Sequence, residues 1–330
     1  MERIMRRFLW NGTGEGKRAP LVKWDLCKAS KPNGGLGILD LDCFNKALLI
    51  KWLWRYIIEV GSWWRELIAS KYQHKHSIWI TQTLKYGFGS SPWAGISKHY
   101  STLWKLAYFD PGNGCHLSFW YDCWSPGVVL ADSFPRIAAA VTAPEARIAD
   151  VYISSGESFS WVLDFNYRLR GGAESEKNEL LDFLNSLNFA ENLHNPCRPV
   201  WAPNVGSSFS VASVYRCLAD DAFPGVPDFP DAVIWKNIIP PKICFFIWTL
   251  SHGRIPTIDK LQRVGWELAN RCELCRQSEE TQDHLFASCG YSMNVWNLIG
   301  SKCRINTQPR SSIIDVIRSW PSRSSDGFDD

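Results

Sequence analysis

Three cysteines and one histidine near residue 280 constrain this chain more than any other feature of its sequence. Cys272 and Cys275 are separated by two residues, and four residues separate His284 from Cys289. One tight turn can supply the first two ligands and a helix or second turn the others, and three thiolates with one imidazole suit zinc. Because four protein ligands leave no coordination position for water, we predict one structural Zn²⁺ ion that stabilises a segment too small to build its own core.

Two other interpretations of these cysteines stay open. A C-x-x-C pair can arise by chance in a chain with many cysteines, since Cys is commonly buried as a small apolar side chain. A redox C-x-x-C pair is expected at the start of a helix that follows a strand. The residues that lead to Cys275, WELANRCELC, do not have that pattern.

The composition predicts a folded chain with an aromatic core. Its 330 residues are 45% hydrophobic, which is enough for a sizeable buried core. Most of the 18 tryptophans must be buried or stacked, because exposed indole is unfavourable in water. A net charge of +3 is only weakly basic, so charge alone neither predicts nor excludes a nucleic-acid partner.

The cysteine pattern and the first residues predict an intracellular protein, in the nucleus or the cytoplasm. The 11 cysteines are irregularly spread, and the start MERIMRRFLWNG has no apolar stretch followed by a small-residue cleavage site. The most apolar stretch, residues 47–60, is interrupted by Lys51 and Arg55. It is therefore predicted to be a core helix, and no membrane partner is expected.

Hydrophobic periodicity predicts an α+β fold that is mainly α, with helical segments, short strands and a small zinc-stapled module at the carboxy-terminal end. Apolar residues recur every three to four positions over residues 42–72, with an interruption near Gly61 and Ser62. The same periodicity returns over residues 174–193, and Pro240-Pro241 opens a very apolar helix.

The remaining segments are predicted to be less regular. Residues 8–31 are expected to form a strand and loops, and residues 117–120 and 209–211 to form short strands, with Ser213 as the amino-terminal cap of a helix. Residues 126–156 have the composition of a linker with apolar insertions.

We predict that the chain is not an enzyme. The patterns GxxxxGK[ST], HExxH and GxSxG do not occur, and residues 34–37 lack the strand and helix context of a phosphate-binding loop. The paired carboxylates Asp220-Asp221 and Asp329-Asp330 have no flanking strands that could hold two metal ions. His74, His76 and His252 have no ligand-spaced cysteine nearby and are expected in solvent or capping roles.

A series of short motifs runs through most of the chain. The first group is Phe8-Leu9-Trp10, Trp24, Gly34-Gly35-Leu36-Gly37-Ile38, Asn45-x-Ala47-Leu48-x2-Lys51-Trp52-x-Trp54-Arg55, Gly112-x-Gly114 and Phe119-Trp120-x-Asp122-x-Trp124. The second group is Phe209-Ser210-Val211-x-Ser213-x-Tyr215, Trp235-Lys236, Pro240-Pro241-Lys242, Phe245-Phe246-x-Trp248, Arg254-x-Pro256-Thr257 and the four predicted zinc ligands. In this order the motifs resemble the carboxy-terminal part of plant non-LTR (LINE-type) retrotransposon reverse transcriptases, including the module called the reverse-transcriptase zinc-binding domain.

The sequence departs from the family pattern in several places. Cys197-Arg198-Pro199 stands where an acidic residue is expected a few positions before Trp201, and Cys244 occupies a commonly basic position. Neither change involves the predicted zinc ligands. The polymerase-type aromatic-x-Asp-Asp turn, an endonuclease and the acidic set of ribonuclease H are not evident, so the chain resembles a truncated descendant.

The resemblance implies a division of the chain into four segments. Residues 1–126 would be a post-polymerase region, similar to a thumb or connection, and residues 127–208 a linker with a helical segment. Residues 209–300 would be the reverse-transcriptase zinc-binding domain. The tail, residues 301–330, contains one short helical candidate at residues 313–320 and is otherwise rich in Ser, Gly and Asp and expected to be disordered.

By resemblance, the intact proteins copy element RNA into DNA, and the zinc module assists their engagement with nucleic acid. For this chain we therefore predict a non-catalytic fragment that binds RNA or single-stranded DNA. Trp266 would stack on a base or, alternatively, pack against the zinc loop. The residues expected to contact phosphates are Arg254, Lys260, Arg263 and Arg271.

Two alternatives remain at this stage. The zinc loop and the apolar helix at residues 243–250 could form a docking surface for another protein, of unknown identity. The chain could also be a decayed fragment of an element with no selected activity. Salt separates nucleic-acid binding from apolar docking, because only phosphate binding weakens steeply with ionic strength.

Overall fold

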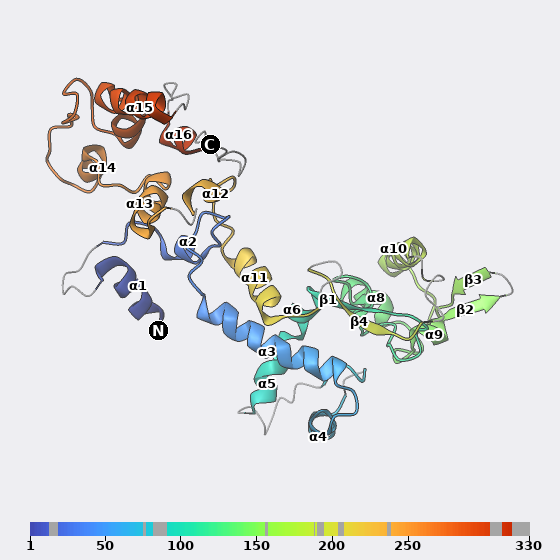
Figure 1. Ribbon diagram of the computed structural model, residues 1–330. Coiled ribbons are helices and arrows are strands. Elements are labelled where there is room, and N and C mark those ends of the chain that lie inside the picture. Colours follow the sequence, from blue (N-terminus) through green and yellow to red (C-terminus); the bar gives the residue numbers. More distant parts are fainter. Residues whose placement is uncertain are drawn as a thin grey trace, which may run out of the picture. The chain divides into compact units, whose positions relative to one another are not determined.

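The computed structural model describes residues 1–12, 19–74, 77–81, 91–155, 158–187, 189, 195–203, 208–235, 239–303 and 312–318 (Figure 1). Within these ranges the chain is mainly helical, and its short strands form two separate two-stranded antiparallel sheets. The predicted fold class, α+β and mainly α, is confirmed. In the same ranges, none of the helices combines the length and the hydrophobicity needed to cross a membrane.

The chain folds into two compact units. The first consists of residues 1–41 and 219–330, and the second of residues 42–218. Each unit has its own cluster of buried apolar side chains. The boundaries of these units differ from the boundaries of the four segments that the family resemblance implies. The four segments stay predictions.

The second unit begins with a group of helices. They are α3 (Leu41–Ile58), α4 (Trp63–Tyr72), α5 (Pro92–Ile96), η1 (Ser97–His99) and α6 (Tyr100–Trp104). The break between α3 and α4 confirms the predicted interruption near Gly61 and Ser62. Ala47, Ile50 and Leu53 of α3 are fully buried, whereas Lys51 is exposed. This spacing of three to four residues puts one face of α3 into the core.

Aromatic packing dominates the core of the second unit, as the tryptophan content predicts. Trp54 of α3 stacks on Phe209, with ring centroids 5.1 Å apart and planes 9° apart. It also meets Trp201 edge to face at 5.9 Å. Trp201 ends β4 (Arg198–Trp201), which pairs antiparallel with β1 (Ala107–Asp110). Aromatic pairs of this kind contribute about 0.5–1.5 kcal/mol each beyond the area that they bury.

The first and last helices of the second unit lie side by side. The rings of Phe44 in α3 and Tyr215 in α11 (Val211–Ala222) meet edge to face at 6.2 Å, and Cys43 Sγ lies 3.9 Å from the carbonyl oxygen of Leu218. The strand predicted at residues 209–211 is therefore wrong. Ser210 Oγ accepts the N–H of Ser213 (3.1 Å), and Ser213 Oγ accepts the N–H of Ser210 (3.3 Å), so Ser210 and not Ser213 caps α11.

The middle of the second unit is more ordered than its composition suggests. The linker-like residues 126–156 contain α7 (Leu130–Ser133), α8 (Pro135–Ala138) and α9 (Ile148–Val151). Leu130, Ile137 and Ile148 are all buried. Helices of one turn are too short to show hydrophobic periodicity, which explains the incorrect prediction. Two strands and a long helix complete this part: β2 (Tyr152–Ser155), β3 (Ser158–Trp161) and α10 (Gly172–Ser186).

The strand predicted at residues 117–120 is also wrong. The N–H of Ser118 donates to the Asp122 carboxylate (2.7 Å), and the N–H of Phe119 donates to the carbonyl of Ala146 (2.9 Å). Ser118 forms only an isolated bridge to Arg147. The N–H of Ser118 is therefore bound to the Asp122 side chain, whereas in a strand it would donate to a neighbouring strand.

The first unit is assembled from both ends of the chain. Its elements before the metal-binding region are α1 (Glu2–Asn11), α2 (Trp24–Lys28), α12 (Asp231–Ile234), α13 (Pro241–Ser251) and α14 (Ile258–Arg263). The helices α1 and α2 correct the prediction of strand and loop over residues 8–31. The tail includes the end of α15 (Gly290–Cys303) and, where a short helix is predicted, α16 (Ile313–Arg318), with Ile313 buried. Its other residues lie outside the described ranges.

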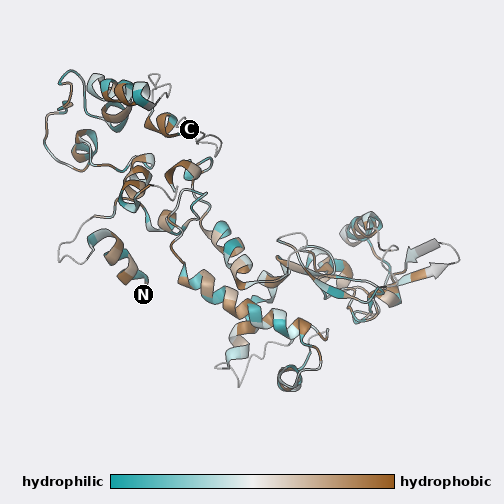
Figure 2. Cartoon of the chain, in the orientation of Figure 1, coloured by the Kyte–Doolittle hydropathy of each residue, from teal (hydrophilic) through white to brown (hydrophobic). Residues whose placement is uncertain are grey.

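The glycine-rich turn at residues 31–37 is fixed to α13, the helix that Figure 2 colours as hydrophobic over most of its length. Trp248 is fully buried and its Nε1 donates to the carbonyl oxygen of Gly34 at 2.8 Å. His252 Nε2 lies 2.7 Å from the same oxygen, so this histidine has a structural role. Within the turn, Gly35 packs directly against the backbone of Ala29. Only glycine fits there, because a Cβ at residue 35 would lie 1.8 Å from the carbonyl oxygen of Ala29.

Candidate metal centre

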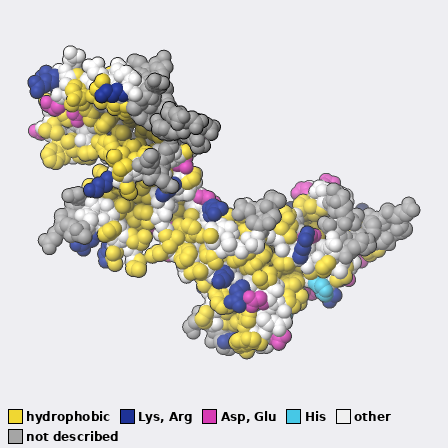
Figure 3. All heavy atoms as spheres, viewed as in Figure 1, with side chains coloured by type: hydrophobic (Ala, Val, Ile, Leu, Met, Phe, Trp, Pro, Cys, Tyr) yellow, Lys and Arg dark blue, Asp and Glu magenta, His cyan; other side chains and the backbone are white. Residues whose placement is uncertain are grey.

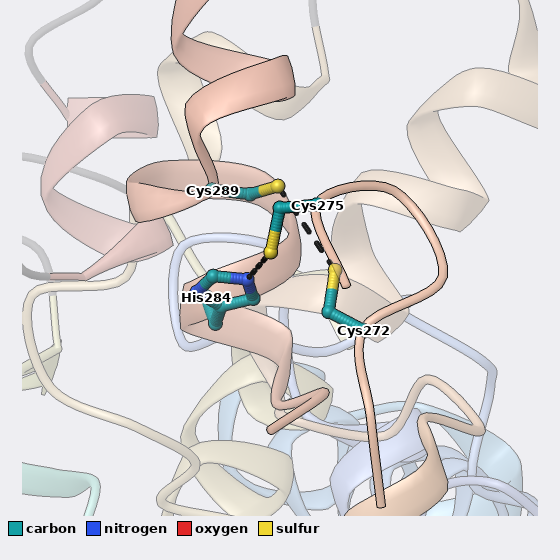
Figure 4. A group of neighbouring side chains, drawn as sticks. All are labelled: Cys272, Cys275, His284 and Cys289. Atoms are coloured by element: carbon teal, nitrogen blue, oxygen red, sulfur yellow. Dashed lines mark hydrogen bonds between the residues drawn. The ribbon is translucent and has the colours of Figure 1, made fainter. Parts of the chain in front are cut away.

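The predicted ligands Cys272, Cys275, His284 and Cys289 point toward one another (Figure 4). Their ligand atoms all lie within 4.8 Å of one another. Cys275 Sγ lies 3.3 Å from His284 Nε2, and Cys272 Sγ lies 3.9 Å from Cys289 Sγ. With Zn–S of about 2.3 Å and Zn–N of about 2.05 Å, a tetrahedral site has S···N of about 3.6 Å and S···S of about 3.8 Å. The donor set and its spacing therefore fit a Zn²⁺ ion.

A tight turn positions the first two cysteines. The N–H of Cys272 donates to the carbonyl of Ser278, and the N–H of Arg276 donates to the carbonyl of Cys272, both at 2.8 Å. Arg276 takes a left-handed conformation with φ of 57°, which reverses the chain direction. Both sulfurs consequently face the same side. The two cysteines lie in a turn and not at the start of a helix, where a redox pair is expected.

A π-helical turn positions the other two ligands. His284 begins η3 (His284–Ser288), and Cys289 follows it directly, with its N–H donating to the carbonyl of His284 at 2.7 Å. In an α-helix, residues five apart lie about 140° apart around the axis. The wider π-helical turn brings them back to one side, and such turns are frequent at functional sites. Thr281 Oγ1 accepts the N–H of His284 at 3.1 Å and so fixes the start of this turn.

The two thiols of the C-x-x-C pair have different electrostatic environments. The N–H of Gln277, 3.5 Å from Cys275 Sγ, and the neighbouring His284 together lower the pKa of this thiol to about 6. Burial instead raises the pKa of the Cys272 thiol. Only the thiolate is a metal ligand, so we expect metal binding to release the proton of Cys272.

The segment that holds the ligands is fastened to the rest of the first unit. Phe286 of η3 meets Phe246 of α13 edge to face, with ring centroids 5.9 Å apart. Trp296 Nε1 of α15 donates to the carbonyl of Phe286 at 2.8 Å. The Asp283 carboxylate accepts the N–H of Ile313 at 3.0 Å, at the start of α16.

The residues predicted to contact nucleic acid lie on α14 and on the loops that flank it. Arg254 precedes α14 and is exposed, and Trp266 follows it with 61% of its surface exposed. Lys260 is partly buried on α14, where the exposed side chain of Arg263 pairs with the mostly buried carboxylate of Asp259 at 3.4 Å. Arg271 is exposed and donates from Nε to the carbonyl of Arg276 at 3.0 Å.

Sequence reasoning missed a set of exposed apolar side chains near this centre. They lie in the loop between the two cysteines and on the outer face of α15; the members are Leu274, Tyr291, Val295 and Leu298. In the sequence, the spacing of the last three is typical of a buried helix face, and no signal distinguishes it from one.

Comparisons with known proteins agree on the class of this chain. The sequence model of the family described as zinc-binding in reverse transcriptase matches residues 209–296. An Arabidopsis thaliana protein named as a ribonuclease H protein, At1g65750, is 25% identical over 306 residues, which cover 90% of this chain and 46% of that protein. The Arabidopsis thaliana mitochondrial protein AtMg00310 is 30% identical over 124 residues, covering 36% of this chain and 77% of that protein.

The comparison with solved structures gives no match. The chain spans about half the length of its ribonuclease H-named relative and most of the length of the mitochondrial one. Its carboxy-terminal match contains all four residues of the Cys and His cluster. The chain therefore belongs to the plant retrotransposon reverse-transcriptase-related proteins that carry the zinc-binding domain of reverse transcriptases.

Proposed function

We propose that this chain is a non-catalytic, zinc-binding fragment of a retrotransposon reverse transcriptase that assists the binding of RNA or single-stranded DNA. Cys272, Cys275, His284 and Cys289 would hold one structural Zn²⁺ ion, which would join the turn to η3 and supply folding free energy. The observation that carries the proposal is the convergence of these four ligand atoms within 4.8 Å, inside the matched family domain. From the cysteine pattern, we also propose that the protein is intracellular.

The surroundings of the centre support a nucleic-acid partner. The indole of Trp266 is 61% exposed, which favours stacking on a base over packing against the zinc loop. The side chain of Arg263 is 70% exposed although it pairs with the mostly buried carboxylate of Asp259, so its guanidinium is accessible to a phosphate. Aromatic stacking with nearby cations is the usual mode of single-strand binding.

We propose that the chain contributes binding and no chemistry of its own. Asp220 and Asp221 are exposed on the last turn of α11, a position that does not hold two metal ions. The relative named for ribonuclease H is longer, and this chain spans 46% of it. The expected result is that the purified chain does not cleave an RNA–DNA hybrid in Mg²⁺, and metal-dependent cleavage would contradict this part of the proposal.

Elemental analysis after dialysis against a mild chelator tests the metal centre. The wild-type chain should retain about one zinc per molecule, and Cys275→Ser should lose it. Cys115→Ser is the matched control, because Cys115 is an exposed cysteine of the second unit. Absence of zinc from the wild type, or equal zinc in all three proteins, would overturn the assignment.

Fluorescence anisotropy with labelled single-stranded RNA and DNA tests the partner. Trp266→Ala should weaken binding by about 1–3 kcal/mol, the usual value of one stacked base, which is roughly 5- to 150-fold. Trp63→Ala is the control, because Trp63 is also exposed but lies on α4. Replacing Arg271 with alanine should reduce the slope of log affinity against log salt concentration by about one, the value for one phosphate contact. Unchanged affinity in Trp266→Ala would refute the stacking role.

The same titration at two salt concentrations separates the alternatives. Binding that falls steeply with salt supports phosphate contacts. A zinc-loaded chain that binds neither nucleic acid would instead favour a protein-interaction module or a decayed fragment.

A further inference from the structure

A groove beside the metal centre is lined by apolar side chains and two carboxylates. It has a volume of about 460 Å³ and lies between the loop of the two cysteines and α15. Leu274, Phe286, Tyr291 and Val295 are among the apolar side chains that line it. The charged side chains that line it are both carboxylates, those of Glu273 and Glu280.

The apolar surface continues along α15. Tyr291, Val295 and Leu298 follow one another by four and three residues, so they share one helix face. They are 58%, 42% and 58% exposed. Figure 3 shows hydrophobic side chains at the surface of the part of the chain that carries α13 to α15. An exposed apolar stripe beside a groove is typical of a surface that binds another helix.

Helix α1, in the same unit, has the complementary properties. Ile4 and Phe8, which are four residues apart and share one face, are 67% and 69% exposed. Arg3 and Arg7, each next to one of them in the sequence, are also exposed. The opposite face holds α1 in place, because Trp10 packs against Phe245 with ring centroids 6.2 Å apart.

We propose that α1 of one copy of this chain docks into the acidic apolar groove of a second copy. Ile4 and Phe8 would cover the stripe of Tyr291, Val295 and Leu298, and the two arginines would face the carboxylates of Glu273 and Glu280. These two carboxylates disfavour phosphate, so this surface is separate from the nucleic-acid contacts. Because each copy presents both α1 and the groove, a reciprocal exchange closes a two-fold symmetric dimer. This inference goes beyond the proposed function and does not depend on it.

Sedimentation velocity across a concentration series tests the dimer. Val295→Glu places a carboxylate in the groove beside Glu273 and should weaken dimerisation at least tenfold. Asn294→Glu is the matched control, since Asn294 is the preceding exposed residue of the same helix and does not line the groove. It adds the same charge and should leave dimerisation unchanged. Zinc content and circular dichroism confirm that each variant is folded.

A mixing experiment identifies the two surfaces that meet. Phe8→Glu removes the apolar face of α1, and Val295→Glu removes the groove, so each variant alone should be monomeric. Their mixture retains one intact α1 and one intact groove, and it should therefore form a heterodimer. A wild-type chain that stays monomeric, a Val295→Glu chain that dimerises as tightly as the wild type, or a mixture that stays monomeric would each overturn the proposal.

Discussion

Lys28 is a buried cation whose removal should destabilise the first unit strongly. Its side chain is 9% exposed, and its Nζ lies within 3.0–3.3 Å of three carboxylates, those of Asp40, Glu2 and Asp25. The ammonium also lies 4.1 Å from the centre of the Phe223 ring. Burial lowers the pKa of Lys28, but hydrogen bonds to the three carboxylates outweigh it and raise the pKa above its ordinary value. The side chain is therefore charged at neutral pH.

Lys28→Met keeps the shape of the side chain and removes its charge. The Asp40 side chain, which is also 9% exposed, then loses the cation 3.0 Å from its oxygen. Breaking a buried ion pair by removing one partner costs about 3–5 kcal/mol. Glu2 and Asp25 are much more exposed, so the loss of their ion pairs with Lys28 adds little to this free energy. The equilibrium for local opening should rise by roughly two to three and a half orders of magnitude.

Hydrogen exchange measured by mass spectrometry is the assay. Peptides from residues 19–41 should exchange faster in Lys28→Met, and peptides from residues 42–72, which belong mainly to the second unit, should not. The double variant Lys28→Met/Asp40→Asn removes both charges and should recover most of the protection. Unchanged exchange in the single variant, or a double variant as unstable as the single one, would refute the reasoning.

Three further predictions concern the turn, a buried acid and the metal. Gly35→Ala should unfold the glycine-rich turn, because its Cβ would lie 1.8 Å from the Ala29 carbonyl oxygen; the measurement is loss of exchange protection in α2. Burial raises the pKa of Asp122 from its ordinary value of 3.8 to about 7, so between these values the folded state holds a proton that the unfolded state releases. Stability of the second unit should therefore fall as pH rises from about 4 to 7, by up to about 1.4 kcal/mol per pH unit, and urea titrations of Asp122→Asn should lack this slope. Removal of zinc by a strong chelator should increase exchange in residues 272–289 and leave α3 protected, whereas loss of protection throughout the chain would contradict a local role.

The metal centre could be predicted from the sequence because its ligands are local. Cys272 and Cys289 lie within one short segment, and their chemistry specifies the donor set before any fold is known. The long helices α3 and α10 also follow directly from their periodicity. In these cases the determining residues are neighbours in the chain.

The rest depends on contacts between distant residues, which periodicity does not encode. The acceptor of Trp248 Nε1 is the carbonyl of Gly34, 214 residues away, and this contact joins the two ends of the chain in one unit. Ser118 donates to a side chain and not to a strand. The exposed stripe of Tyr291 and Val295 has the same spacing as a buried one, so only the fold distinguishes an interaction surface from a core.

The adjacency of α3 and α11 makes the second unit an insertion within the first. Its entry and exit are close, since Cys43 Sγ lies 3.9 Å from the Leu218 carbonyl. Insertions with neighbouring ends can be gained, lost or exchanged without breaking their host, because a short connection replaces them. The two halves of the first unit cannot be separated in this way, because the hydrogen bond from Trp248 to Gly34 and the core around it join residues from both halves. In such an architecture, the segment that holds the metal centre and the segment near the amino-terminal end would be inherited together, while the aromatic-rich part between them is free to diverge.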